Sequence, residues 1–296
     1  MSEIQHIVVY GGGTMGQGIA ELLSKKGLDV TVVEKTKTLA RQSRQQVEIK
    51  LDKQLSRWGI TQAEKKSILS RIDFTDHDAS LEKADLVIEA VTEDLESKKA
   101  VLERSDRLSP EHTILSSNTS TMSVTELAAV TCRPEQVIGL HFLHPSTRVH
   151  LVEIVRGLKT SPETVQKVRP FLDRLNLVGV EVFESPGFVT TRLIVTLINE
   201  ALYTLMEGVA TPSDIDAAMK HGFQFPYGPL EMADRFGLDS VLAWMERLFR
   251  EYGDSKFRPA PLLKKMVRAN QLGVKTGEGF FRYDEDGDRL KEDEKR

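Results

Sequence analysis

The stretch Ile7-Val8-Val9-Tyr10-Gly11-Gly12-Gly13-Thr14-Met15-Gly16 decides the fold of this chain. An apolar run leads into a Gly-x-Gly-x-x-Gly turn, and a second apolar run, Val30–Val33, ends on Glu34. Glu34 follows Gly16 by 18 positions, close to the roughly 20 that are typical of a dinucleotide-binding strand–helix–strand unit. The pattern predicts that the chain begins with such a unit.

Each part of this pattern has a physical task. Gly11 permits the tight turn, Gly13 lets the backbone approach a pyrophosphate, and Gly16 lets the helix pack closely. The backbone N–H groups at the helix start, at Thr14 and Met15, would face the phosphates, whose negative charge the helix dipole favours. The turn is therefore expected to bind the pyrophosphate of a nicotinamide cofactor.

The acidic residue at the end of the second strand predicts which cofactor binds. Glu34 would accept hydrogen bonds from the adenosine ribose and would repel a 2′-phosphate, so NAD is favoured over NADP. Lys35 and Lys37 act against that preference because they would attract the phosphate. The alternative is a glycine turn without a ligand, but the two flanking strands and the acid favour cofactor binding.

The composition is that of an ordinary soluble globular protein and argues against a disulfide-rich, a nucleic-acid-binding or a membrane protein. The chain has 296 residues, a formal net charge of −4 and one cysteine, Cys132, so an internal disulfide is impossible. We expect a cytoplasmic protein that binds neither nucleic acid nor membrane. The first residues lack the pattern of a signal peptide, and no apolar run reaches the ~18 residues that a membrane span needs.

Short apolar runs recur along the first part of the chain, with helical segments between them. They predict strands at Ile7–Tyr10, Val30–Val33, Ile72–Thr75, Leu86–Ala90, Thr113–Ser116, Val137–Leu140, Leu151–Val155 and Leu177–Val182. The first five and Val137–Leu140 are typical of strands that are buried on both faces of a parallel sheet. We therefore expect an α/β fold with a Rossmann-type doubly wound sheet.

The character of the sequence changes at Glu184-Ser185-Pro186-Gly187, and beyond it helical patterns predominate. We expect two domains, residues 1–184 for NAD binding and 185–296 as an all-helical domain for substrate binding and dimerisation. The helix predicted over Phe188–Met206 has apolar residues on more than one face, which indicates burial on two sides. This pattern predicts an interdomain contact and a homodimer interface.

One histidine stands out among the seven. An enzyme that oxidises an alcohol with a nicotinamide cofactor needs a base near neutral pKa, and histidine suits this role. His141 directly follows the predicted strand Val137–Leu140 and so lies at a strand's carboxyl end, where open α/β sheets bind their ligands. The alternative is a core histidine with a structural role.

Several longer motifs extend this interpretation over nearly the whole chain, and together they resemble the 3-hydroxyacyl-CoA dehydrogenase family, including the bacterial 3-hydroxybutyryl-CoA dehydrogenases. In chain order they are Tyr10–Ala20, Ile88–Glu93, Ser117-Asn118-Thr119-Ser120, His141-Phe142-Leu143-His144-Pro145, Leu151–Val155, Pro186-Gly187-Phe188 and Lys275-Thr276-Gly277-Glu278-Gly279-Phe280-Phe281.

The resemblance implies catalytic roles at matching positions. It makes His141 the catalytic base and Glu153 the carboxylate that hydrogen-bonds the other ring nitrogen. Such a carboxylate fixes the tautomer of the base and stabilises the imidazolium. Ser120 matches the serine that contacts both substrate and nicotinamide.

The resemblance also implies contacts to the cofactor and to CoA. Glu93 and Lys98 match cofactor contacts around the ribose, and Lys275 matches a lysine that reaches the cofactor site. Lys50 and Arg57 fall where the family contacts CoA. Solvated surface charges are the alternative for all of these except Lys275.

The chain departs from the family pattern at two positions. His144 and Thr191 each replace an asparagine, and the second asparagine helps to hold the carbonyl region of the substrate. Threonine has one hydroxyl in place of an amide's separate donor and acceptor. We therefore expect either a slower enzyme or a different substrate, since losing a hydrogen bond to the reacting carbonyl lowers the rate on the order of 10²-fold.

The function expected from these observations is reversible, NAD-dependent oxidation of a 3-hydroxyacyl thioester to the 3-oxoacyl thioester, as in fatty acid metabolism. Alternatives are a dehydrogenase for hydroxyacyl carrier proteins or free hydroxy acids, and a non-catalytic NAD-binding protein. His141 and His144 form His-x-x-His with Glu153 further on, but the ligand count is short of a closed metal site, so no metal is expected.

Overall fold

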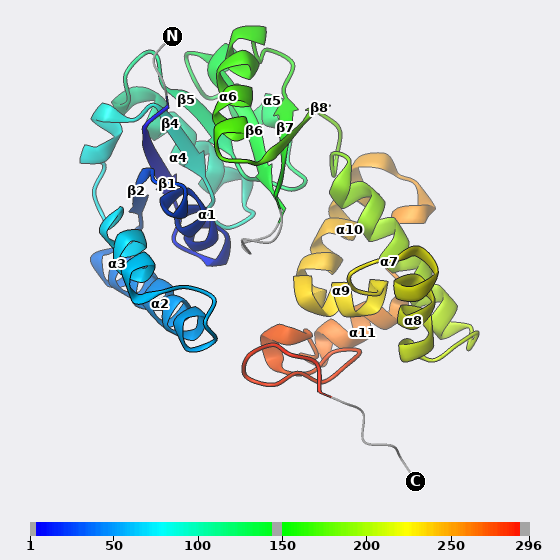
Figure 1. Ribbon diagram of the computed structural model, residues 1–296. Coiled ribbons are helices and arrows are strands. Elements are labelled where there is room, and N and C mark those ends of the chain that lie inside the picture. Colours follow the sequence, from blue (N-terminus) through cyan, green and yellow to red (C-terminus); the bar gives the residue numbers. More distant parts are fainter. Residues whose placement is uncertain (1–3, 144–149, 291–296) are drawn as a thin grey trace. The chain divides into compact units, whose positions relative to one another are not determined.

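The structure is a computed structural model that describes residues 4–143 and 150–290. The chain divides into two compact units, Met1–Ser185 and Pro186–Arg296. Figure 1 shows the sheet in the first unit and the helices of the second, and each unit is described here by itself.

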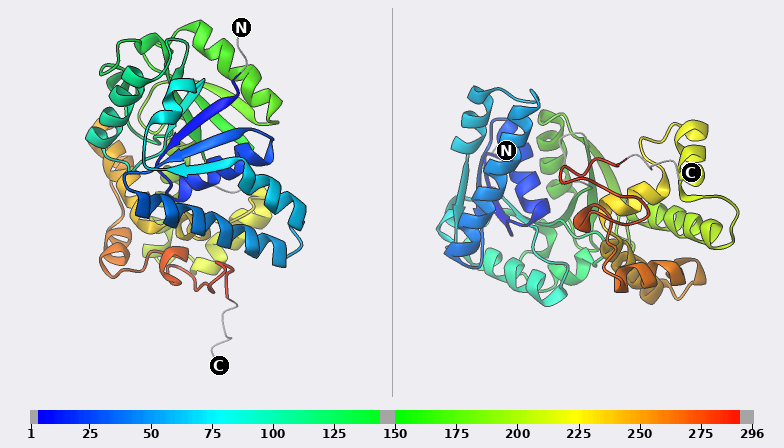
Figure 2. Two further views of the ribbon diagram at one scale, coloured as in Figure 1. Left: turned by 90° about the vertical axis from the view of Figure 1, so that its left-hand side faces the viewer. Right: turned by 90° about the horizontal axis from the view of Figure 1, so that it is seen from below.

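A single sheet of eight strands forms the centre of the described part of the first unit, in the order β3-β2-β1-β4-β5-β6-β7-β8. The strands are β1 (His6–Tyr10), β2 (Asp29–Val33), β3 (Ile72–Thr75), β4 (Leu86–Glu89), β5 (Ile114–Ser117), β6 (Val137–Phe142), β7 (Leu151–Arg156) and β8 (Val178–Phe183). Strands β1 to β6 are mutually parallel, so the predicted doubly wound sheet is confirmed. The left view in Figure 2 shows how the strands twist across the sheet.

Helical segments connect the parallel strands, because two parallel strands can be joined only by a crossover from one end of the sheet to the other. The helices of this unit are α1 (Thr14–Lys25), α2 (Lys37–Ser56), α3 (Gln62–Ser70), α4 (Leu95–Leu108), α5 (Val124–Ala128) and α6 (Pro162–Arg174), with short 3₁₀ turns η1 (Ala79–Lys83) and η2 (Pro134–Gln136). Ser161 caps the start of α6, because its hydroxyl accepts a hydrogen bond from the Thr164 N–H at 3.1 Å.

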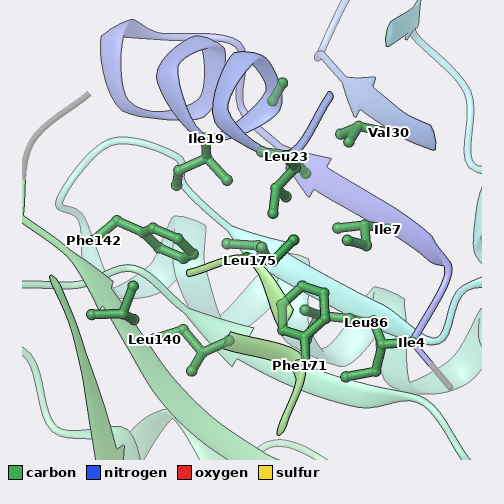
Figure 3. Packing of buried hydrophobic residues seen from close by; sticks show 14 of the residues in the cluster. Ile4, Ile7, Ile19, Leu23, Val30, Leu86, Leu140, Phe142, Phe171 and Leu175 are labelled. Carbon is green, nitrogen blue, oxygen red and sulfur yellow. The ribbon is translucent and has the colours of Figure 1, made fainter. Parts of the chain in front are cut away.

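One hydrophobic cluster of this unit lies between the sheet and the helices on one face, and strand side chains that point to the other face, such as Val8, Val87 and Leu115, are buried as well. Figure 3 shows Ile19 and Leu23 of α1 above Ile7 of β1, and Phe171 of α6 beside Leu86 of β4. These side chains come from alternate positions of the strands and from one stripe of each helix, the pattern by which both elements bury an apolar face.

Strand order changes direction between β1 and β4, because β2 and β3 lie on one side of β1 and β4 to β8 on the other. Open α/β sheets bind ligands at such a switch point, beyond the carboxyl ends of the strands. The glycine turn follows β1 directly, so it lies at this point.

The last strands depart from the parallel pattern. β7 is antiparallel to β6, and β8 is parallel to β7. His141 was expected just after a strand, but β6 continues to Phe142, and His141 lies within it. The reason is that β7 pairs with the extended end of β6, where His141 stands opposite Glu153 in the register.

A helical hairpin of α2 and α3 follows β2 and packs against α1. Val47 and Leu51 of α2 are buried, whereas the apolar Leu39 is exposed. Ala40 is buried instead, because the face that α2 turns to the core passes through position 40.

The regular secondary structure of the second unit is helical over its described residues, apart from three isolated β-bridges within residues 273–289. Its elements are α7 (Thr190–Met206), α8 (Pro212–Phe223), α9 (Pro229–Phe236), α10 (Leu238–Tyr252), η3 (Ser255–Phe257), α11 (Pro261–Arg268) and η4 (Val274–Thr276). One face of α7 contributes Val195, Ile198 and Leu202 to the core of this unit, whereas Leu193 is 67% exposed.

A buried carboxylate holds the segment that ends the second unit. Asp234 of α9 accepts hydrogen bonds from the Phe280 N–H, the Phe281 N–H and the Tyr283 hydroxyl, each at 3.0 Å. Burial is the largest influence on Asp234 and raises its pKa to about 6 despite these donors.

No helix in the described part of the chain is both long and apolar enough to cross a membrane.

Candidate active site

The glycine turn between β1 and α1 is built by close backbone contacts. A Cβ on Gly16 would come within 1.8 Å of the Gly11 carbonyl oxygen, and one on Gly11, whose φ is +94°, within 2.7 Å of the Ala90 carbonyl oxygen. A Cβ on Gly13 would meet no described atom within 4 Å. Open space over Gly13 is what a bound pyrophosphate requires.

The start of α1 is suited to an anion. Gly13 precedes the helix, no side chain of the described residues caps it, and its first turn contains no acidic residue. The N–H groups of this turn, from Thr14 and Met15 onward, are therefore not opposed by a local carboxylate. These features fit the pyrophosphate of a dinucleotide.

Glu34 holds the glycine turn as well as marking the end of β2. Its Oε1 accepts a hydrogen bond from the Gly12 N–H at 2.7 Å, and the Ser43 hydroxyl of α2 bonds the Gly12 carbonyl oxygen at 2.9 Å. A Cβ on Gly12 would come within 2.3 Å of the Ser43 Oγ. Gly12 and Ser43 thus shape the turn, although the fingerprint assigns them no role.

A histidine–carboxylate pair lies across strands β6 and β7. His141 Nδ1 is 2.7 Å from Glu153 Oε2, and both residues are buried. An ionised carboxylate can only accept, so Nδ1 carries the proton and Nε2 presents its lone pair. The pair can therefore accept a proton at Nε2 while Glu153 stabilises the resulting charge.

Ser120 completes this chain of polar groups. Its Oγ is 3.0 Å from His141 Nε2, so the hydroxyl donates to the lone pair of the histidine. Ser120 follows β5 and His141 belongs to β6, and these strands are paired in parallel. The three predicted catalytic residues are thus brought together from neighbouring strands.

Glu93 positions the loop that contains Ser120. Its Oε1 accepts from the Ser120 N–H at 3.1 Å and from the Thr119 hydroxyl. Its Oε2 is 3.1 Å from Lys98 Nζ. Glu93 therefore connects the loop after β5 to a cation on α4.

Lys98 is buried, with 1% of its surface exposed, which argues against the alternative of a solvated pair. Besides Glu93, its Nζ contacts both carboxylate oxygens of Glu89, at 2.9 and 3.1 Å, and the Val91 carbonyl oxygen at 3.4 Å. Glu89 is fully buried and also accepts from the Ser117 hydroxyl and the Val91 N–H. Two carboxylates and one ammonium group thus form a cluster at the ends of β4 and β5.

The pKa values in this cluster reflect burial and charge. Burial raises the pKa of Glu89 above its ordinary value. Burial is the largest single influence on Glu93 and Lys98 and alone would raise the pKa of Glu93 and lower that of Lys98, but the opposite charges and the hydrogen bonds of the cluster together outweigh it. The pKa of Glu93 is therefore lowered and that of Lys98 raised.

Glu89 and Asn118 are site residues to which sequence reasoning gave no role. Asn118 Oδ1 accepts from the Phe142 N–H at 2.8 Å and so joins the loop after β5 to the end of β6. Glu89 could have been found from its charge inside the apolar run Leu86–Ala90, since a buried charge requires a partner. Asn118 could have been found from the family motif Ser117-Asn118-Thr119-Ser120, of which it is part.

Two predicted site residues belong to the second unit. Thr191 is buried at the start of α7. Lys275 of η4 contacts Asp239 at 2.8 and 3.0 Å and the Ser240 Oγ at 3.0 Å. Its ammonium group is thus held at the start of α10.

The predicted CoA contacts lie on the α2–α3 hairpin. Lys50 Nζ is 2.9 Å from Oε2 of the buried Glu21 on α1, so Lys50 also ties α2 to the domain. Arg57 caps the end of α2 and is exposed.

Residues 4–143 and 150–290 contain no group of three or more side chains that could hold a metal ion. His144, which formed part of the His-x-x-His pattern and replaces a family asparagine, lies outside the described residues.

Comparison with known proteins identifies the family from both units. The 3-hydroxyacyl-CoA dehydrogenase NAD binding domain matches residues 6–185, and the C-terminal domain of the same family matches residues 187–283. The chain belongs to the 3-hydroxyacyl-CoA dehydrogenase family. The first of these matches covers the glycine turn and the Ser120–His141–Glu153 chain.

Relatives of this dehydrogenase family resemble the chain over almost its whole length. A probable 3-hydroxybutyryl-CoA dehydrogenase of Bacillus subtilis is 43% identical over 96% of this chain and 99% of its own. The crystal structure of FadB2 from M. tuberculosis has a TM-score of 0.92 at 35% identity, over 96% of this chain and all of that one. The (S)-3-hydroxybutyryl-CoA dehydrogenase PaaH1 from Ralstonia eutropha has a TM-score of 0.86 at 41% identity, over 95% and 100% of the two chains.

Proposed function

We propose that this protein is an NAD-dependent dehydrogenase that reversibly oxidises a short 3-hydroxyacyl-CoA, such as 3-hydroxybutyryl-CoA, to the 3-oxoacyl-CoA. The observation that carries this is the continuous Ser120–His141–Glu153 hydrogen-bonded chain in a domain of the 3-hydroxyacyl-CoA dehydrogenase family. The identity to relatives named 3-hydroxybutyryl-CoA dehydrogenase supports the substrate class.

In this proposal His141 is the general base. A substrate hydroxyl that lies beside Ser120 would present its proton to Nε2, which carries the lone pair because Nδ1–H is bonded to Glu153. The Ser120 hydroxyl would hold the substrate oxygen in place. NAD, when bound, accepts the hydride from the carbon that bears this oxygen.

The charge that appears on His141 is met by Glu153. Both residues are buried, so their attraction is little weakened by water. In the direction of reduction, the imidazolium returns its proton to the carbonyl oxygen. Glu93 and Lys98 act by fixing the loop of Ser120, and a ribose contact of Glu93 is part of the proposal.

We assign acyl-group selection to the second unit through Thr191, and a cofactor contact to Lys275. Val189 and Leu193, four positions apart at the start of α7, are both exposed, and this supports a homodimer, since contiguous exposed apolar side chains are typical of a subunit interface. The single cysteine supports a reducing compartment such as the cytoplasm.

Turnover of acetoacetyl-CoA with NADH, followed by the loss of NADH absorbance, tests this proposal. We expect turnover by the wild type, and a strongly decreased kcat in His141→Ala. Turnover of carrier-protein thioesters or free hydroxy acids alone would contradict the assignment of CoA as the carrier. Tight NADH binding without turnover of any of these would indicate a non-catalytic NAD-binding protein.

A further inference from the structure

Trp58, at the tip of the α2–α3 hairpin, is in an unfavourable position for the folded protein. It is 95% exposed, so its indole ring contributes little buried apolar area. Its φ is +58°, in the left-handed region that non-glycine residues with a large side chain rarely adopt. The fold therefore gains nothing that would explain a tryptophan here.

The backbone around Trp58 forms a helix C-terminal motif that usually places glycine at this position. The Trp58 N–H bonds the Leu55 carbonyl oxygen at 3.1 Å, and the Gly59 N–H bonds that of Gln54 at 2.8 Å. These are the two bonds of a Schellman motif, in which Trp58 is the left-handed residue. The backbone fixes Trp58 there, while Ile60 turns inward and packs against the core.

Other left-handed residues of the described chain have an evident reason to be there. Asn176, Gln224 and Asn270 are polar, and Phe188 is 3% exposed, so burial offsets its strain. Trp58 has neither feature. An exposed aromatic ring that has no structural role, on a backbone fixed by hydrogen bonds, points to a ligand with a flat surface.

The charges around Trp58 indicate what this ligand carries. Residues 37–57 contain six basic side chains against the two acidic ones, Glu48 and Asp52. Lys53 and Arg57 are one helical turn apart at the end of α2, which Trp58 follows directly in the chain, and both are exposed. A flat ring beside cationic groups suits a base that is attached to phosphates.

We propose that Trp58 stacks on the adenine ring of the CoA portion of the substrate. The family resemblance already implies a CoA contact at Arg57, and Trp58 would add recognition of the base, with Lys53 and Arg57 next to its phosphates. This inference rests on the proposed function, which supplies a thioester that ends in a phosphorylated adenosine. The adenine of NAD is not a candidate, because α2 has 20 residues and, at about 1.5 Å per residue, separates Trp58 from Glu34 by roughly 30 Å.

Binding of CoA alone tests the proposal without turnover. The chain has two tryptophans, and Trp244 packs edge-on against Phe236, so a Trp244→Phe background leaves Trp58 as the reporter. We expect saturable quenching of Trp58 fluorescence by CoA and by adenosine 3′,5′-bisphosphate, but not by pantetheine. A signal that does not respond to either nucleotide would overturn the proposal.

Kinetics with full-length and truncated thioesters separates this inference from the function on which it rests. Trp58→Ala should raise KM for acetoacetyl-CoA roughly 5- to 100-fold, as loss of one stacked base predicts, and should leave KM for acetoacetyl-pantetheine unchanged. Trp58→Phe should retain most of the affinity. Ile49→Ala, which removes another exposed apolar side chain of α2, is the matched control.

Two further outcomes complete the test. Trp58→Gly should unfold at no lower temperature than wild type, because glycine relieves the left-handed strain, and yet lose the same affinity for CoA. An unchanged KM for acetoacetyl-CoA in Trp58→Ala, or a loss confined to carrier-protein thioesters, would overturn the proposal. If wild type turns over no thioester, the proposed function fails, and the fluorescence titration still decides the role of Trp58.

Discussion

His141 and Glu153 stand directly opposite each other in the antiparallel pairing of β6 and β7, with Nδ1 and Oε2 2.7 Å apart. Backbone hydrogen bonds of the sheet thus hold both members of the pair. This arrangement orients the imidazole without relying on a loop, and it is the basis of the first prediction.

The pair is expected to act as one unit. His141→Ala should lower kcat by about 10²- to 10⁴-fold, and Glu153→Gln by less, while NADH affinity stays unchanged because neither residue touches the glycine turn. In the double variant the losses should not add. Full activity of His141→Ala in steady-state assays would contradict the mechanism.

Glu34 is expected to set the preference for NAD. Glu34→Gln keeps an acceptor for the Gly12 N–H but removes the negative charge, so it should narrow the difference between the Kd values for NADH and NADPH. Glu34→Ala should also weaken NADH binding, by roughly 10-fold or more for a lost bond to a charged group. If wild type already binds both cofactors equally in a calorimetric titration, the role given to Glu34 is wrong.

The buried cluster of Glu89, Lys98 and Glu93 should be sensitive to loss of its cation. Lys98→Met leaves two buried carboxylates without a countercharge and should lower the free energy of unfolding by about 3–5 kcal/mol. Glu89→Gln should cost less, because Glu93 still balances the ammonium group. Denaturant unfolding of both variants and of the double variant checks this, and strictly additive losses would argue against a coupled cluster.

Thr191→Asn restores the amide that the family has at this position. We expect kcat on acetoacetyl-CoA to rise, by up to about 10²-fold if the amide regains a bond to the reacting carbonyl. Thermal unfolding serves as the control, because Thr191 is buried and asparagine is larger. No gain in a stably folded variant with His141 still essential would indicate a different natural substrate.

Asp234 should make the stability of the protein depend on pH. Its folded-state pKa of about 6 lies above the ordinary value of about 3.9, so the folded form binds the proton more tightly. The stabilisation of the folded state by the tightly bound proton of Asp234 is fully present below pH 4 and is lost as the pH rises through 6. The free energy of unfolding relative to Asp234→Asn should therefore fall by about 2 kcal/mol from pH 4 to pH 7. A difference that stays constant with pH would show that Asp234 has an ordinary pKa.

The sequence predicted the inner strands of the first unit well, because β1, β4, β5 and β6 are short apolar runs whose side chains are almost all buried. The sequence also predicted where β7 and β8 lie in the chain. It did not predict whether each runs parallel or antiparallel to its neighbour, since an apolar run does not specify which strand it will pair with. His141 was therefore placed after a strand, although it lies inside β6.

The catalytic trio was identified through family motifs, and composition alone would have left His141 as one histidine among seven. Glu89 escaped notice because its role depends on Lys98, nine positions away, approaching it across the end of a strand. The strain at Trp58 is likewise a property of backbone angles that no residue pattern displays.

The register between β6 and β7 also determines which kinds of genetic change this enzyme can tolerate. Successive side chains of a strand point to opposite faces, so inserting or deleting one codon within either strand would turn His141 or Glu153 away from its partner. A point substitution elsewhere in these strands leaves the facing pair intact. Single-residue insertions and deletions in these two segments should therefore be much rarer among functional descendants of this gene than amino-acid replacements.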